Sequence, residues 1–158
     1  MRMPKLELAT LPVKTGSIYP APYDALMTGR SSLRLGQSGG LSQFGVNIVT
    51  LEVGATSSLR HWHLKEDEFV MILEGTCHLI EDDGATSMKV GDCAAFPANT
   101  PNGHCFENRS EAAAKFLVVG SKMPDEEATY SDVDLHVKIT DAGPIFSHWD
   151  GTPFQGAK

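Results

Sequence analysis

The sequence has no long hydrophobic run and few cysteines. No apolar stretch approaches the roughly 18 residues that span a bilayer as a helix, so we expect no membrane association. Residues 1–8 lack the apolar core of a secretory signal peptide. The three cysteines form no Cys-x-x-Cys pair, and an odd number of thiols is most simply explained as reduced. These absences predict a cytoplasmic protein without disulfides or a thiolate zinc site.

Positive charge is scarce and unevenly distributed. The chain carries 13 Lys and Arg against 20 Asp and Glu, a net charge of −7. Residues 1–40 hold five basic and two acidic residues, a net +3, whereas the remainder holds eight and eighteen, a net −10. An acidic body without a basic stripe predicts no nucleic-acid binding. The basic segment, with Arg30 and Arg34, is expected to lie on the acidic body of its own chain or a partner, and few basic residues are expected on the inward face.

Short β-type runs follow one another from Phe44 onward, at the spacing of an all-β sandwich or barrel. Eight strands are predicted, the number of a double-sheet jelly roll: residues 44–52, 57–63, 68–74, 76–81, 86–90, 93–96, 104–108 and 115–120. Outside them, 5–10 alternates like an edge strand, 123–130 suggests a short helical turn, and 132–139 suggests one more strand. At 158 residues the chain is one domain, with an arm at 1–42, a barrel at 43–122 and an extension at 123–158.

A His-x-His pair is the most informative feature of the chain. His61 and His63 are two residues apart, so on a strand both point to the same face. Glu68 opens the apolar run 69–73, and a loop of about four residues would bring it back beside the histidines. Two imidazoles and a carboxylate on adjacent strands form most of a metal site. The neighbouring acids Glu66 and Asp67 are expected to be solvated.

A second segment, 91–108, extends this pattern. Together the two segments resemble the paired motifs of the cupin family, through Gly54, His61, His63, Glu68 and Gly75 in the first and Gly91, Pro97, His104 and Asn108 in the second. Asn99 replaces a motif glycine, and asparagine tolerates the positive φ that a turn there requires. The loop is two residues longer than the usual pattern, so either Asn102 or His104 could fill the last ligand position. Imidazole binds divalent metals far better than an amide does, which favours His104.

The resemblance implies a cupin-type double-stranded β-helix, a jelly-roll barrel, with arms at both ends. It implies a metal held by His61, His63, Glu68 and His104, and a homodimer. Such ligands suit one divalent transition metal, Zn, Fe, Mn or Ni. The chain is similar to single-domain bacterial cupins described as sugar-phosphate isomerases, which implies a metal-dependent enzyme on a small oxygen-rich substrate. An Fe-dependent dioxygenase, a lyase and a non-catalytic ligand-binding cupin are the alternatives.

Strand alternation also predicts an apolar wall beside the metal. Val70 and Ile72 share the face of Glu68, and Phe106 shares the face of His104. These three residues are candidates for substrate contact, since small-molecule sites are mostly apolar. Ordinary core packing is an equally good interpretation of the same pattern.

Overall fold

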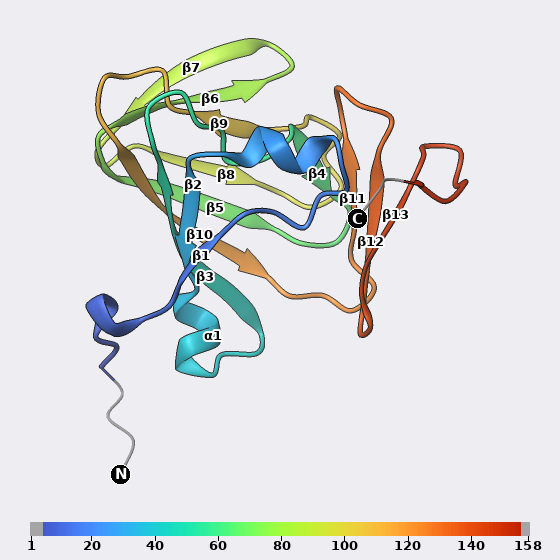
Figure 1. Ribbon diagram of the computed structural model, residues 1–158, viewed down its shortest axis with the longest axis horizontal. Helices are drawn as coiled ribbons and strands as arrows, with labels where there is room; N and C mark the ends of the chain where they lie inside the picture. The colour runs from blue at the N-terminus through green and yellow to red at the C-terminus, as the bar shows by residue number, and fades with distance from the viewer. Residues whose placement is uncertain (1–4, 156–158) are drawn as a thin grey trace.

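The computed structural model describes residues 5–155, which form an open sandwich of antiparallel β-sheets with little helix (Figure 1). The predicted all-β, jelly-roll fold class is confirmed, although the sheets do not close into a continuous barrel. The first wall is a six-stranded sheet whose strands lie side by side in the order β1 (Val13–Thr15), β2 (Arg30–Leu33), β3 (Phe44–Leu51), β10 (Ala114–Ser121), β5 (Glu68–Glu74) and β8 (Cys93–Phe96).

The opposite wall consists of two smaller sheets. One runs β7 (Gly84–Lys89), β6 (Thr76–Glu81) and β9 (Cys105–Glu107), and the other runs β13 (Gly143–Ser147), β12 (His136–Thr140), β11 (Glu127–Tyr130) and β4 (His61–His63). Two isolated bridges join them, between Thr56 and Glu107 and between His61 and His104. The two small sheets therefore act as one wall, and the second bridge lies at their junction.

Apolar side chains from both walls fill the sandwich. The main core takes alternate residues of β3, β5 and β10 from one wall and of β6, β7 and β9 from the other, including Leu51, Ile72, Leu79 and Phe116. A second, smaller core lies under β11 and β12, around Tyr130 and Leu135. Residues of the N-terminal segment and of the C-terminal tail pack against it. Residues 19–23 of the arm and the C-terminal tail thus meet at the same side of the sandwich.

Several strand predictions match the structure closely. The bounds predicted for β5, β6 and β8 are those observed. The strand predicted at 57–63 is reduced to His61–His63, because residues 57–60 form single hydrogen bonds with Phe106 and Ser131 and no ladder. The edge strand predicted at 5–10 was wrong, since Leu8–Thr10 is a 3₁₀ turn (η1). The helical turn predicted at 123–130 was also wrong, because Glu127–Tyr130 pairs with both β4 and β12.

The N-terminal arm contains elements that the sequence did not reveal. Besides β1 and β2 it includes a 3₁₀ helix at Tyr23–Met27 (η2) and a short α-helix at Leu35–Gly39 (α1). Because β2 pairs with β3, the arm extends the six-stranded sheet. In the described residues no helix is long and apolar enough to cross a membrane, and all three cysteines are free thiols.

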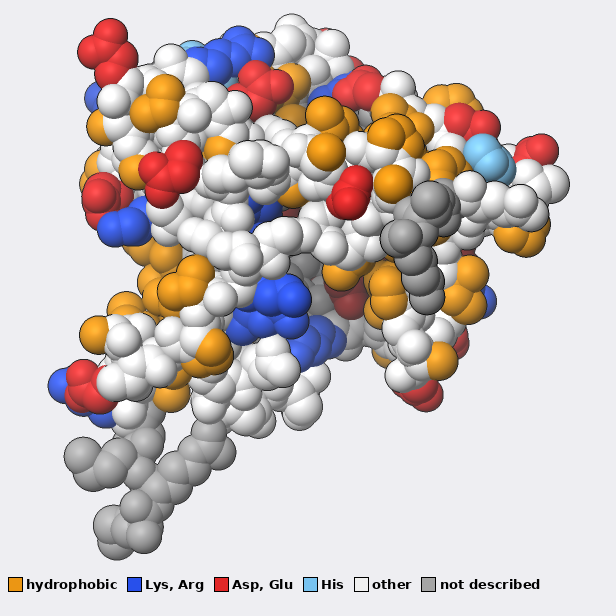
Figure 2. Space-filling view, viewed as in Figure 1, with side chains coloured by type: hydrophobic (Ala, Val, Ile, Leu, Met, Phe, Trp, Pro, Cys, Tyr) orange, Lys and Arg blue, Asp and Glu red, His pale blue; other side chains and the backbone are white. Residues whose placement is uncertain are grey.

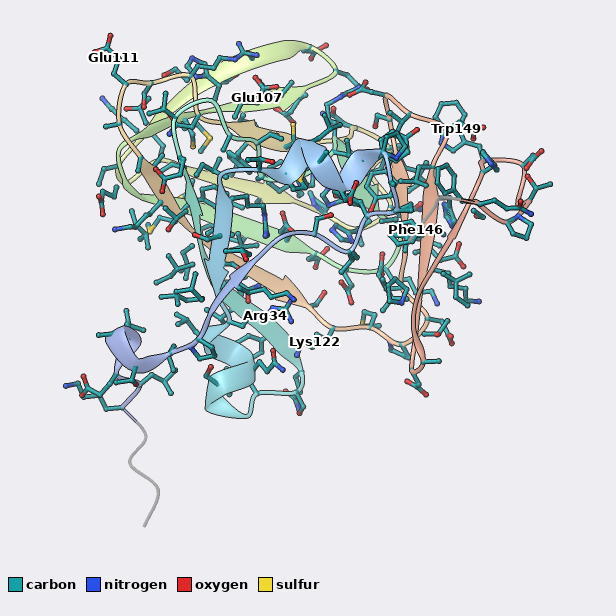
Figure 3. The ribbon with its side chains drawn as sticks, in the orientation of Figure 1. Arg34, Glu107, Glu111, Lys122, Phe146 and Trp149 are labelled. Atoms are coloured by element: carbon teal, nitrogen blue, oxygen red, sulfur yellow. The ribbon has the colours of Figure 1, made fainter. Side chains whose placement is uncertain are left out.

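The surface is hollowed between the arm and the C-terminal strands. Figure 2 shows Lys and Arg side chains gathered in this hollow, and Figure 3 labels Arg34 and Lys122 at the same place. Some cations of the basic arm therefore face a cavity, and the position of the arm on an acidic surface stays a prediction.

Asn108, the last residue of the second motif, is a polar anchor within the fold. Its side chain is 1% exposed. The Nδ2 group donates to the carbonyls of Leu51 and Ala112 at 2.9 and 2.8 Å, and Oδ1 accepts from the backbone and hydroxyl of Ser110. The amide thus fixes the turn after β9 to the end of β3.

Replacing Asn108 by Ala should therefore destabilise the protein. The buried Leu51 carbonyl would lose its side-chain donor and the exposed Ala112 carbonyl would keep only that of Ser110, at a cost of about 1–3 kcal/mol in the free energy of unfolding. Urea denaturation would measure it. Arg109→Ala, an exposed neighbour, is the matched control and should stay within about 0.5 kcal/mol of the parent. Equal unfolding midpoints for Asn108→Ala and the parent protein would contradict this role.

Candidate metal centre and its pocket

Three histidines and one glutamate meet where the walls of the sandwich come together. His61 and His63 project from β4, His104 lies opposite His61 in the bridge, and Glu68 begins β5 on the facing sheet. The Nε2 atoms of His61 and His63 are 3.2 Å apart. Glu68 Oε1 lies 3.1 Å from His104 Nε2, and Oε2 lies 3.7 Å from His63 Nε2. All four residues proposed from the sequence are brought together.

The turn before His104 decides which residue reaches the cluster. Asn99 adopts a φ of +58°, the left-handed conformation expected of an asparagine in place of the motif glycine. Reciprocal backbone hydrogen bonds of 2.9 and 3.2 Å then pair His104 with His61. Asn102 instead accepts a hydrogen bond from the Asp82 amide and donates one to Glu81. The two extra loop residues are absorbed by the turn, and His104 keeps the inward position.

Neighbouring groups orient the imidazole rings. His61 Nδ1 lies 2.8 Å from the Leu59 carbonyl, so it carries the proton and leaves the Nε2 lone pair facing the cluster. His63 Nδ1 lies 3.5 Å from the buried carboxylate of Glu126. The His104 ring stacks on Phe96, with ring centroids 3.5 Å apart. These contacts fix the orientation of the rings, as supporting contacts do in metal sites.

Electrostatics keeps the cluster attractive to positive charge. Burial, aided by His63 and His104, lowers the pKa of His61 to about 4, so its imidazole is neutral at pH 7. Burial alone would raise the pKa of Glu68, but hydrogen bonds with His104 and His63 outweigh it and the pKa falls. For His63, burial lowers the pKa, but the carboxylates of Glu68 and Glu126 together outweigh that effect, so the pKa is raised. The centre thus favours an ionised carboxylate with a positive charge beside it.

The donor atoms suit a transition metal. Ligand atoms about 2.1 Å from one ion lie about 3 Å apart in neighbouring positions, close to the separations found in this cluster. Within residues 5–155, no three His, Cys, Asp or Glu side chains already form a group arranged to hold an ion. The assignment rests instead on the pairwise contacts between these side chains. A protonated Nδ1 leaves Nε2 as the coordinating atom.

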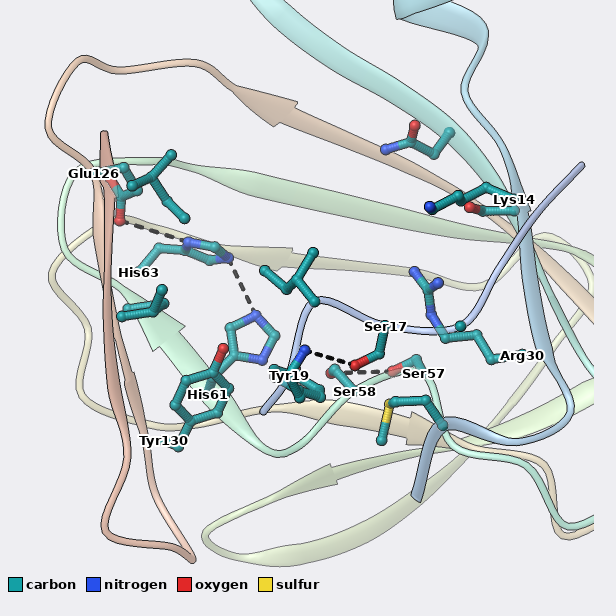
Figure 4. Close-up of a pocket in the computed structure, with 18 of the residues that line it drawn as sticks. Lys14, Ser17, Tyr19, Arg30, Ser57, Ser58, His61, His63, Glu126 and Tyr130 are labelled. Carbon is teal, nitrogen blue, oxygen red and sulfur yellow. Dashed lines mark hydrogen bonds and ion pairs between the residues drawn. The ribbon is translucent and has the colours of Figure 1, made fainter. Parts of the chain in front are cut away.

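A pocket of about 390 Å³ opens beside two of these histidines. His61, His63 and Glu126 form one end, and Lys14 and Arg30 lie at the other (Figure 4). Its volume lies in the range of small-molecule sites. The expectation that few basic residues face inward was wrong, because it did not include β1 and β2.

Two pocket acids were missed from the sequence. Glu66 was expected to be solvated, yet it is half-buried and lines the pocket. Burial raises its pKa above the ordinary value of 4.5. Glu126 is 2% exposed and accepts hydrogen bonds from the backbone amides of Leu64 and Lys65. Both lie in acidic runs typical of solvated loops, so only the tertiary structure distinguishes them.

Comparison with known proteins places this architecture in a family. Residues 47–120 match the family described as Cupin domain. A crystal structure described as a sugar phosphate isomerase from a cupin superfamily, from Silicibacter pomeroyi, is 56% identical to the chain, with coverage of 96% of this chain and 97% of that one and a TM-score of 0.94. The chain belongs to the cupin superfamily.

More distant cupin structures share the fold alone. A protein from Acidithiobacillus ferrooxidans is 21% identical over 81% of each chain, with a TM-score of 0.72. The polyketide cyclase RemF from Streptomyces resistomycificus is 17% identical over 76% of this chain and 80% of its own, with a TM-score of 0.61. Among curated protein sequences, none matches the chain.

The apolar residues proposed for substrate contact lie in the core of this cupin. Val70, Ile72 and Phe106 are 0%, 1% and 2% exposed and pack within the main hydrophobic cluster. None of them lines the 390 Å³ pocket. Their packing agrees with the alternative interpretation, ordinary core, and contact with a substrate stays a prediction.

Gly103 allows the His104 loop to approach β4 closely. A Cβ atom added there would lie 2.0 Å from Ser131 Oγ and 3.3 Å from the backbone nitrogen of His61. Arg60 ties the same loop to the chain after β11, since it donates to the Gly103 carbonyl at 3.1 Å and forms two hydrogen bonds with Asp132. Any side chain larger than hydrogen would push His104 away from its bridge.

Gly103→Ala should therefore destabilise the cupin by about 1–3 kcal/mol through overpacking, as measured by chemical denaturation. Gly45→Ala is the matched control, since its added Cβ would find no atom closer than 3.8 Å. In a double-mutant cycle, Ser131→Gly should recover part of the loss, because the pair is coupled by direct contact. Strict additivity of the two substitutions would show that the clash is not the cause.

Proposed function

We propose that this cupin binds one divalent transition metal through His61, His63, Glu68 and His104. We further propose that it acts on a small oxygen-rich substrate as a metal-dependent isomerase, with sugar phosphates as the substrate class. The observation that carries the proposal is the convergence of these four side chains beside a pocket of substrate size, which His61 and His63 line. The description of the 56% identical Silicibacter pomeroyi protein as a sugar phosphate isomerase supports it.

The ligand set leaves room for a substrate. Four protein ligands leave one or two positions open on a five- or six-coordinate ion. A bound ion would supply Lewis-acid polarisation of neighbouring oxygen atoms on the substrate. Because His61 and His63 line the pocket, the substrate would approach the centre from their side.

Isomerisation of an aldose to a ketose also needs a base, which takes a proton from one carbon and returns it to the neighbouring carbon. Glu66 is the best-placed candidate. It lines the pocket, and burial raises its pKa toward the range in which carboxylates exchange protons efficiently. The Met123 amide donates to Oε1 at 2.9 Å and fixes the carboxylate. Oε2 accepts no hydrogen bond among the described residues and is available for the proton.

Tyr19 and Tyr130 shield the His61 side of the pocket. Their rings meet edge to face with centroids 5.4 Å apart, and the Tyr130 ring lies 5.8 Å from that of His61. Burial raises the pKa of both phenols, so each remains protonated at neutral pH. These residues would exclude water from one side of the reacting carbons without competing for the proton.

Two further proposals concern the oligomeric state and the location of the protein. We propose a homodimer in the cytoplasm. Apolar side chains exposed on the arm and on the C-terminal segment, such as Val13 at 63% and Trp149 at 56%, support an interface with a second copy. Light scattering of the purified protein would give its oligomeric state directly.

Metal binding should stabilise the parent protein and depend on His104. Adding Mn²⁺ or Zn²⁺ to chelator-treated protein should raise the melting temperature, since an ion at about 100 times its Kd contributes about 2.7 kcal/mol. His104→Ala should lose this shift and its metal in elemental analysis. Asn102→Ala, the control at the competing position, should retain both. If Asn102→Ala alone lost metal, the ligand set would be wrong.

Glu66→Gln should lower kcat on aldose or ketose phosphates by about 10²- to 10⁴-fold, the usual contribution of a general base, with metal content unchanged. The base must be ionised, so parental turnover should rise with pH through the raised pKa of Glu66. Glu66→Gln should flatten that acid limb. Asp67→Asn, at the exposed neighbour, is the control. Turnover that required O₂ would contradict the isomerase proposal and favour a dioxygenase.

A further inference from the structure

The end of the pocket away from the histidines is built from cations of the N-terminal arm. Lys14 on β1 pairs directly with Ser32 on β2, and paired residues of neighbouring strands point to the same face. Arg30 and Arg34 lie two residues to either side of Ser32, so strand alternation places them on that face as well. All four residues line the pocket, and Figure 4 shows Lys14 and Arg30 across it from His61 and His63.

No acidic group neutralises these cations. In residues 5–155, none of the ion pairs involves Lys14, Arg30 or Arg34. The two pocket carboxylates are engaged elsewhere, since Glu126 accepts from the Leu64 and Lys65 amides and Glu66 accepts from the Met123 amide. The cationic end therefore faces the cavity with its charge uncompensated.

Arg30 is the cation whose lack of a partner is most evident. Its Nε atom is buried and has no hydrogen-bond partner. A buried polar atom of a charged group is costly without a partner, and burial lowers the pKa of this guanidinium. Arg34 lies close enough to add repulsion. A fold retains such an arrangement at a cost in stability, which an anion bound between the two guanidinium groups would offset.

We propose that Lys14, Arg30 and Arg34 form a phosphate-binding subsite at the end of the pocket opposite His61 and His63. Guanidinium groups match phosphate oxygens with paired N–H donors, and Lys adds a point charge. The serine hydroxyls of Ser32 and Ser57, which also line the pocket, are further donors.

This inference rests on the proposed function for the opposite end of the pocket. There, His61, His63, Glu68 and His104 would hold a metal ion that polarises the oxygen atoms of the reacting carbons. A substrate would then need an oxygen pair at one end and a phosphoryl group at the other. The pocket would thus select phosphorylated over neutral sugars, and the arm would set that specificity.

Inorganic phosphate is the simplest probe, measured by isothermal titration calorimetry at constant ionic strength with the full chain. Chelator-treated parent protein should bind phosphate without any metal. Arg30→Gln and Arg34→Gln should each weaken binding about tenfold or more, since hydrogen bonds to charged groups contribute that much. Arg30→Lys should recover part of the affinity. Lys138→Gln is the matched control, because Lys138 is an exposed strand cation outside the pocket and should bind phosphate like the parent.

The outcomes separate this subsite from the metal proposal. Phosphate binding that needs metal and is unchanged in Arg30→Gln and Arg34→Gln would overturn the subsite and leave the metal proposal intact. Phosphate binding that depends on the arginines in a protein that takes up no metal would support the subsite and contradict the proposed function. Should Arg30→Gln fail to fold, the exposed Arg34 decides: unchanged affinity in Arg34→Gln would overturn the inference.

Discussion

The two-residue bridge between His61 and His104 is the contact on which the site depends. It makes one wall of two small sheets, and it sets two imidazoles side by side with backbone hydrogen bonds. A register shift of one residue would turn either ring to the opposite face. The bridge also depends on Gly103, because a Cβ atom there would clash with Ser131, and on Arg60, which donates a hydrogen bond to the Gly103 carbonyl. The candidate metal centre is thus positioned mainly by backbone hydrogen bonds, and side-chain contacts then orient the rings.

The pocket depends on a different part of the chain. Its histidine end belongs to the sandwich, whereas its cationic end comes from β1 and β2, and Tyr19 of the arm packs against Tyr130 of β11. Arm and C-terminal strands share the second hydrophobic core. The cupin sandwich therefore supplies the candidate metal centre, and the arm and the C-terminal strands line the adjoining pocket.

The convergence of the four proposed metal ligands could be predicted from the sequence because their signals are local. A strand with period two fixes the common face of His61 and His63, and the apolar run after Glu68 fixes the start of β5 with its observed bounds. The positive φ of Asn99 also followed from residue chemistry. Glu66, Glu126 and the arm cations could not be found in this way, because each gains its role from chain segments distant in sequence. Strand alternation correctly predicts that a side chain points inward, but it cannot tell whether that side chain lies in the core or lines a cavity. This is the case for Val70, Ile72 and Phe106.

Local charge matters more than net charge for a substrate at this site. The chain carries a net −7, which would repel an anionic molecule from a distance. Screening limits that repulsion to about 8–10 Å at physiological ionic strength. Inside the pocket the sign is reversed, since Lys14, Arg30 and Arg34 have no acidic partner among the described residues while Glu126 and Glu66 are tied to backbone amides. A pocket with imidazoles around a carboxylate at one end and bare cations at the other is polarised along its length. It would orient a bifunctional anion before any chemistry begins, a form of preorganisation that the composition of the chain conceals.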